Sequence, residues 1–146
     1  MEDWRKVKRV VFARHSNPWS MWTRWASTPL MLVPVWRRSR RDAALVGLWM
    51  AVNPVVFSKP AHDQAWATRA ALGEEQWIAK RPMDTAMAVN VAATAALLVA
   101  MVAAHQRRAV PAAAATALEM GLLMVYWELM ARYYDRNGGV SRTSRS

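Results

Sequence analysis

The chain of 146 residues contains no cysteine, which excludes disulfide frameworks, thiol nucleophiles, iron–sulfur clusters and zinc sites built on cysteine. It has three histidines, His15, His62 and His105, too few for a histidine-rich site, and we predict no metal ion. Its five glycines form neither a G-x-G-x-x-G sequence nor a Walker A loop, so the common nucleotide-binding loops are excluded too. The sequence does not identify a cofactor.

Apolar residues are abundant, and they are concentrated in long segments. They make up 54% of the chain, and residues 85–104 contain no charged side chain at all. As a helix with a rise of about 1.5 Å per residue, this segment is about 30 Å long, which matches the hydrocarbon core of a bilayer. Residues 109–131 are nearly as apolar. A soluble Ala-rich bundle is the alternative, but its helices would each keep a polar face, and 85–104 has none.

We therefore predict an all-α fold, a small polytopic protein of the cell membrane with about four transmembrane helices. The expected spans lie near 18–36, 42–57, 84–104 and 109–132. The alternative for 18–36 is a re-entrant or interfacial segment. Residues 1–136 would form one membrane domain, and 137–146 a disordered basic tail. The total of Lys and Arg favours cytoplasmic termini, although the dense charge of the short turns favours the reverse.

A first polar segment, HSNPWSMWTR, covers residues 15–24. Asn17 followed by Pro18 predicts the start of a helix, because Asn caps well and Pro fits the first turn. His15, Trp19 and Arg24 lie close to this start. Aromatic rings there could hold a cation, and the basic groups could hold an anionic headgroup. Anchoring of the tryptophans at the membrane surface is the simpler alternative.

The connection 58–83 predicts an amphipathic interfacial helix near 61–80. Read as a helix, one stripe holds His62, Trp66, Arg69, Gly73 and Trp77. In a functional interpretation, His62 and Asp63 exchange protons and Arg69 binds a phosphate or carboxylate. In a structural interpretation, the helix is anchored on the membrane by its two tryptophans.

Polar residues inside the expected spans should face the bundle interior, because they are costly in hydrocarbon. These residues are Asn53, Asn90, Glu119 and Glu128. For Glu128 an ion pair with Arg132, four residues later, is the simplest role. Glu119 lies deep in its span, so it either pairs with an Arg or Asn of another helix or is protonated. A protonated acid there could serve proton transfer to an apolar substrate. Asp84 is expected to cap the third span.

Four short motifs of the sequence resemble those of a known family. They are HSNPWSMWTR at 15–24, AVNPVVFSKP at 51–60, DQAWATR at 63–69 and GEEQW at 73–77. Together they resemble a family of uncharacterised small integral membrane proteins of bacteria and haloarchaea, a domain of unknown function. The resemblance implies a membrane protein and supplies no activity. It also implies that the family pattern includes His15, Asn17, Trp19, Arg24, Asn53, Trp66, Arg69, Glu74 and Trp77.

Our functional hypothesis is a membrane-embedded enzyme or binding protein for a lipid or isoprenoid-like substrate at the interface. Its catalytic candidates are His15, His62, Asp63, Glu74 and Glu119. Its substrate-binding candidates are Asn17, Trp19, Arg24, Asn53, Trp66, Arg69 and Trp77. The alternative is a non-catalytic structural or accessory subunit of a membrane complex. The expected partners are membrane lipids and an apolar or lipid-like small molecule, and a homo-oligomer is compatible with the sequence. We expect no nucleic acid, because the basic flanks of the spans account for the net charge of +10.

Overall fold

The computed structural model describes residues 16–62, 64–80 and 82–143, and their side chains as far as residue 137. Within these ranges the chain is all-helical and has no strand, which confirms the predicted fold class. The elements are α2 (Pro18–Ala26), the 3₁₀ helix η1 (Thr28–Met31), α3 (Leu32–Arg37), α4 (Arg40–Val56), α5 (Trp66–Lys80), α6 (Thr85–His105) and α7 (Ala109–Thr143).

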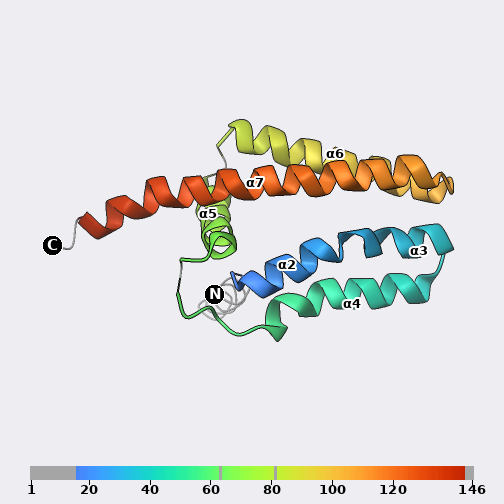
Figure 1. The fold of residues 1–146 in the computed structure, drawn as a ribbon, viewed down its shortest axis with the longest axis horizontal. Helices are drawn as coiled ribbons and strands as arrows, with labels where there is room; N and C mark the ends of the chain where they lie inside the picture. Colours follow the sequence, from blue (N-terminus) through green and yellow to red (C-terminus); the bar gives the residue numbers. More distant parts are fainter. Residues whose placement is uncertain (1–15, 63, 81, 144–146) are drawn as a thin grey trace.

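Two antiparallel pairs of helical segments make up most of the molecule (Figure 1). The segment α2–η1–α3 runs beside α4, and α6 runs beside α7. The turn between α3 and α4 and the turn between α6 and α7 lie at the same end, and both are rich in arginine. At the other end α5 crosses α7 and joins the pairs. The helices α2 and α5, which carry parts of the two polar segments, are in contact.

The first expected span, 18–36, is not one helix. Asn17 caps α2 by accepting a hydrogen bond from the Trp19 amide, with Pro18 in the first turn, as the sequence predicts. The helix then ends at Ser27, and the chain continues through η1 into α3. Pro29 explains the break, because it has no N–H to donate and disfavours helical backbone at the residue before it.

The second pair contains the two helices of the described chain that are long and apolar enough to cross a membrane, Thr85–His105 and Ala109–Asn137. Asp84 caps α6 by accepting a hydrogen bond from the Met87 amide, as predicted. By contrast, the uncharged part of α4, residues 43–56, is about 21 Å long at about 1.5 Å per residue. Four complete spans are therefore not shown.

The last helix also extends beyond the predicted boundary of the membrane domain. We predict a disordered tail from residue 137, but α7 continues to Thr143. Pro111 is the last proline of the chain, so no residue after it removes a backbone donor from the helix.

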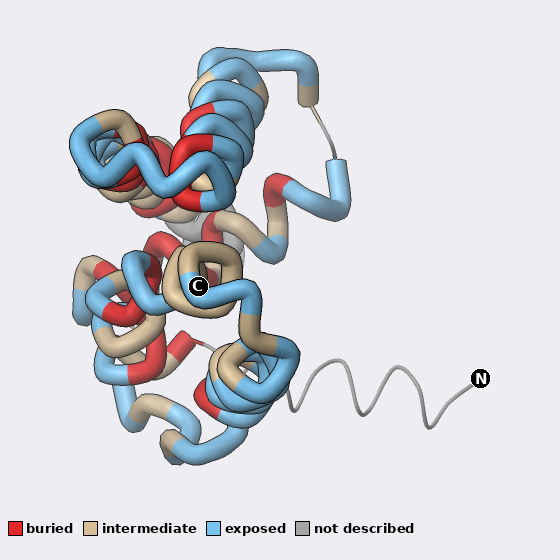
Figure 2. The backbone as a smooth tube through the Cα atoms, turned by 90° about the vertical axis from the view of Figure 1, so that its right-hand side faces the viewer, coloured by how far each residue is buried: buried red, intermediate tan, exposed pale blue. Residues whose placement is uncertain are grey.

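The contact between α6 and α7 is built from small side chains. The buried alanines are Ala86, Ala93, Ala96, Ala100, Ala103 and Ala104 on α6 and Ala112, Ala115 and Ala131 on α7. Larger apolar residues point outward: Leu45, Leu48 and Val52 on α4, Val91, Leu98, Val99 and Val102 on α6, and Val110, Leu118 and Val125 on α7. Figure 2 shows the exposed residues on the outer faces of the helices and the buried ones mainly where helices face each other. The helices thus approach closely through alanine and present their larger apolar groups outward.

Candidate functional site

A cavity of about 250 Å³ lies between the two helix pairs. Besides Thr28 of η1, five polar side chains line it, and they come from four different helices: Arg24 of α2, Glu74 of α5, Asn90 of α6, and Glu119 and Tyr126 of α7. Methionine, leucine, threonine and tryptophan side chains form the rest of the wall. Three of the five polar residues, Arg24, Glu74 and Glu119, are among the residues predicted for the site. The cavity therefore gathers polar groups that are separated by up to a hundred residues in the sequence.

Glu74 is held at the cavity wall by α7. The Tyr126 hydroxyl donates a hydrogen bond to Glu74 Oε1 at 3.1 Å, and the Tyr126 ring packs edge-on against Trp77. Burial raises the pKa of Glu74 above its ordinary value, while the Tyr126 hydrogen bond and the charge of Arg24 act in the opposite direction. The carboxyl group is thus partly removed from water next to a hydroxyl and a guanidinium group.

The shifted pKa of Glu74 predicts a pH-dependent stability. A carboxyl with a higher pKa in the folded state binds its proton more tightly when folded. Its contribution is present at low pH and is lost as the pH rises from about 4.5, the unfolded value, through the folded pKa. In thermal unfolding over a pH series, Glu74→Gln should abolish this decline, which for one proton is at most about 1.4 kcal/mol per pH unit.

Glu75→Gln is the matched control, because Glu75 is the neighbouring carboxyl of α5 and is exposed. It should keep the decline of the unmodified chain. Equal pH profiles for the two variants would contradict the shifted pKa of Glu74.

Glu119 lies on the same face of α7, seven residues before Tyr126. Its side chain is 5% exposed, and it lines the cavity. Its Oε2 atom is buried and has no hydrogen-bond partner in the described part of the chain. The pairing with Arg or Asn that the sequence suggested is thus not made at this oxygen. A buried oxygen without a partner is costly, which makes it a natural contact for a bound molecule.

Tryptophan rings flank the cavity and join its walls. The Trp25 indole N–H donates to the Met120 carbonyl at 3.1 Å, which places Trp25 of α2 beside α7. Trp22 stacks on Trp66 of α5 with ring centroids 5.9 Å apart and meets Trp127 of α7 edge-on at 6.1 Å. Trp25 and Trp127 also line the cavity itself. These contacts connect three helices through large apolar surfaces.

Several predicted substrate-binding residues make internal contacts. The side-chain amide of Asn17 donates to the Ser58 carbonyl at 2.8 Å. The buried Asn53 accepts from Ser20 at 2.9 Å and donates to Thr23 Oγ1 at 2.8 Å. None of these residues lines the cavity. Asn17 and Asn53 therefore join α2 to α4 and to the chain that follows it.

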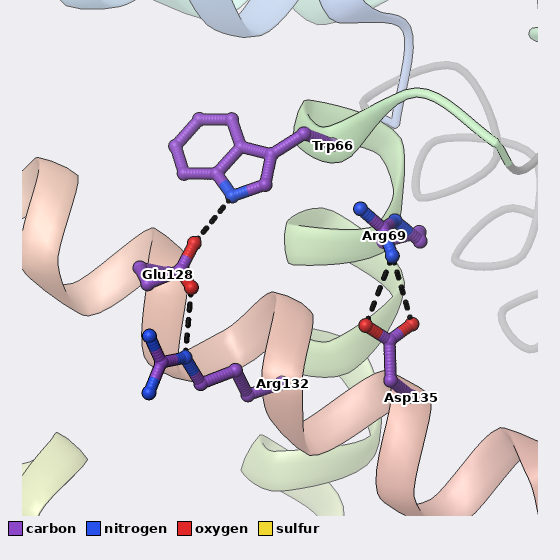
Figure 3. A network of polar contacts seen from close by, with 5 residues as sticks. All are labelled: Trp66, Arg69, Glu128, Arg132 and Asp135. Carbon is purple, nitrogen blue, oxygen red and sulfur yellow. Dashed lines mark hydrogen bonds and ion pairs between the residues drawn. The ribbon is translucent and has the colours of Figure 1, made fainter.

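A second set of predicted residues joins α5 to α7, and Figure 3 shows this network. The Trp66 indole N–H donates to Glu128 Oε2 at 2.7 Å, and Glu128 Oε1 accepts from Arg132 at 2.7 Å. The pairing of Glu128 with Arg132 is thus confirmed. One nitrogen of Arg69 contacts both oxygens of Asp135, at 2.9 and 3.1 Å.

Two comparisons with known proteins find no relative, because no curated protein and no solved structure matches the chain. A family model described as "Family of unknown function (DUF6653)" matches residues 7–137. The chain belongs to this family. The match covers every residue of the site and agrees with the predicted membership of an uncharacterised family.

Three other predicted residues of this DUF6653 chain, His62, Trp19 and Trp77, lie away from the cavity. His62 is exposed and precedes α5, and Trp19 is 70% exposed on α2. Trp77 is buried, and its indole N–H donates to Asp84 at 3.0 Å. His15 and Asp63 lie outside the described residues. Within the described ranges no three His, Asp or Glu side chains gather in a way that could hold a metal ion.

Sequence reasoning assigned three of the twelve cavity residues to the site and left out the other nine, among them Asn90, Tyr126 and Trp127. Asn90 was recognised as a polar residue within a span but was not assigned to the site, and Tyr126 lies on the same face of α7 as Glu119. For Trp127, only the residue type indicated a role in the site. The useful signal was the spacing of seven between Glu119 and Tyr126, which places both side chains on one face of a helix.

Proposed function

We propose that this chain is a multi-pass membrane protein in which both helix pairs enter the bilayer. The support is the distribution of apolar groups: alanine fills the contact between α6 and α7, whereas leucine and valine cover the outer faces. Helices in lipid associate through small residues, because burying large apolar groups gains little there. The exposed apolar faces of α4, α6 and α7 would be unusual on a soluble protein of this size. In this arrangement the two arginine-rich turns lie on one side of the membrane and α5 on the other.

The lack of cysteine allows a direct test of this topology. Single variants Ser39→Cys and Gln106→Cys place a thiol in each turn, and Ala79→Cys places one on the exposed side of α5. We expect a membrane-impermeant maleimide to label the two turn variants in intact cells, with the termini cytoplasmic, and Ala79→Cys only after the cells are opened. Labelling of the two turns from opposite sides would contradict the two-pair insertion.

For the activity, we propose that the cavity binds a small amphipathic molecule, of which a lipid or isoprenoid-like compound is the leading class. The observation that carries this proposal is the cavity of about 250 Å³ whose wall combines five polar residues with aromatic and methionine side chains. Pockets of this kind bind a ligand through an apolar wall and orient it through a few polar groups. Whether a bound molecule also reacts would depend on Glu74 and Glu119, the two carboxyl groups at the wall.

Two matched leucine variants of α7 test the binding. Leu123 lines the cavity, whereas Leu118 on the same helix is 59% exposed. Leu123→Trp should fill the cavity, and Leu118→Trp should leave it open. Native mass spectrometry of the purified protein, followed by extraction, should find one bound molecule per chain in the unmodified protein and in Leu118→Trp but not in Leu123→Trp. Identical spectra for all three proteins would overturn the proposal.

A second candidate function, an accessory subunit of a membrane complex, rests on the internal contacts of the sequence motifs. Hydrogen bonds to residues outside their own helices occupy the polar groups of Asn53, Trp66 and Trp77. A fold built in this way needs no substrate to explain its motifs. Co-purification of another protein in a fixed ratio, without a bound small molecule, would favour this candidate.

A further inference from the structure

We propose that the cavity selects a small organic cation, such as a protonated amine, whose N–H groups contact Glu119 and whose body lies against the tryptophan rings. This inference rests on the proposed binding function and narrows its ligand class. It starts from Glu119, whose buried Oε2 lines the cavity and has no hydrogen-bond partner among the described residues. An ionised carboxyl oxygen accepts hydrogen bonds, so the ligand atom opposite it is a donor, and a positive charge on that atom favours the ionised form of Glu119.

The charges at the wall favour a cation over a neutral donor. The cavity is lined by one basic side chain, Arg24, and two acidic ones, Glu74 and Glu119. Arg24 and Glu74 interact with each other electrostatically, and Glu74 also receives the Tyr126 hydroxyl. Glu119 is then the acidic group whose Oε2 atom receives no hydrogen bond from the described residues. A single positive charge on the ligand complements it, whereas an anion would meet two carboxyl groups.

The aromatic wall supports the same choice. Trp25 and Trp127 line the cavity, and Trp25 is fixed beside Met120, the residue next to Glu119, by its indole hydrogen bond. The faces of indole rings carry negative potential and attract ammonium groups, and this attraction is stronger where water is excluded. Three methionines, Met21, Met31 and Met50, supply an adaptable apolar surface for the rest of the ligand.

The test compares three six-carbon compounds with different head groups: hexylamine, hexanol and hexanoate. Binding to the full chain in lipid nanodiscs is measured by calorimetry at neutral pH, with empty nanodiscs subtracted. We expect hexylamine to bind most tightly. Glu119→Gln should weaken hexylamine binding about 10- to 100-fold, the worth of a hydrogen bond to a charged group, and weaken hexanol binding much less, because hexanol carries no charge.

Two further variants separate the explanations. Glu75→Gln changes an exposed carboxyl on α5 and should leave all three affinities as they are. Leu123→Trp should block every compound that uses the cavity. Equal effects of Glu119→Gln on hexylamine and hexanol, or tightest binding of hexanoate, would overturn the cation inference, and if Leu123→Trp still blocked binding, the proposed function would stand. Hexylamine binding that survives Leu123→Trp would place the amine outside the cavity and overturn the inference as well.

Discussion

Gly73→Ala should be strongly destabilising, by roughly 2–3 kcal/mol, because there is no room for a methyl group at this position. A Cβ atom on Gly73 would overlap the backbone carbonyl of Met130, where α5 crosses α7. A backbone group cannot rotate away as a side chain can, so the two helices would have to separate. For a chain of this length, thermal unfolding should show a midpoint lowered by about 10 °C.

Gly121→Ala is the matched control for this prediction. Gly121 lies in α7, and a Cβ added there would meet nothing within 4 Å. Alanine in an open helical position stabilises by up to about 1 kcal/mol relative to glycine. The two identical substitutions should therefore shift the midpoint in opposite directions. A Gly73→Ala protein as stable as Gly121→Ala would mean that α5 does not cross α7 at this close distance.

The same crossing should also control the cavity. Glu74 follows Gly73 directly and reaches the Tyr126 hydroxyl of α7. If the helices separate, this hydrogen bond lengthens and the cavity wall opens. We therefore expect Gly73→Ala to lose the co-purifying molecule at temperatures where the protein is still folded, whereas Gly121→Ala keeps it.

The helices could be predicted from the sequence because their signals are local. Asn17 with Pro18 and Asp84 mark helix starts by residue type alone, and the uncharged segment 85–104 is long enough to define α6 without any tertiary information. The expectation of one helix over 18–36 was wrong, because Pro29 interrupts the helix although it hardly changes the average hydropathy of the segment. The end of α7 lies later than expected, because the glycines and polar residues after position 136 are typical of a tail when they are considered without the rest of the helix.

The candidate site was less predictable, because its residues meet through packing. Arg24, Glu74 and Glu119 lie on three helices, and no spacing in the sequence brings them together. Trp66 and Arg69 belong to the predicted stripe, but they contact Glu128 and Asp135 of α7 and do not line the cavity. The GEEQW motif combines residues that contact other parts of the fold with a residue that lines the cavity. Gly73 permits the helix crossing, Trp77 bonds to Asp84, and only Glu74 faces the cavity.

Asn53→Leu should also cost about 2–3 kcal/mol, because it removes a buried amide from between α2 and α4. Asn53 is fully buried, accepts from the Ser20 hydroxyl and donates to Thr23 Oγ1. Leucine has the same branched arrangement of heavy atoms, so no empty space is left. The loss comes mainly from the Ser20 hydroxyl, which is left without its acceptor, whereas Thr23 still donates to the Trp19 carbonyl. Asn137→Ala is the control, since the amide of Asn137 bonds within its own helix to the Tyr133 carbonyl. It should change the unfolding midpoint little.

The triple variant Ser20→Ala, Thr23→Val, Asn53→Leu decides whether the hydrogen bonds themselves matter. Replacing both partners of a buried bond by apolar groups of similar shape is close to neutral, whereas removing one partner is costly. The triple variant should therefore recover most of the stability that Asn53→Leu loses, measured by thermal unfolding under the same conditions. A triple variant no more stable than Asn53→Leu would show that the amide stabilises the α2–α4 pair through its shape and not through its two hydrogen bonds. Recovery would instead show that the Asn-Pro motif at 53–54 stabilises the contact between α2 and α4 through hydrogen bonds. Its role would then be structural, unlike that of the carboxyl groups that face the cavity.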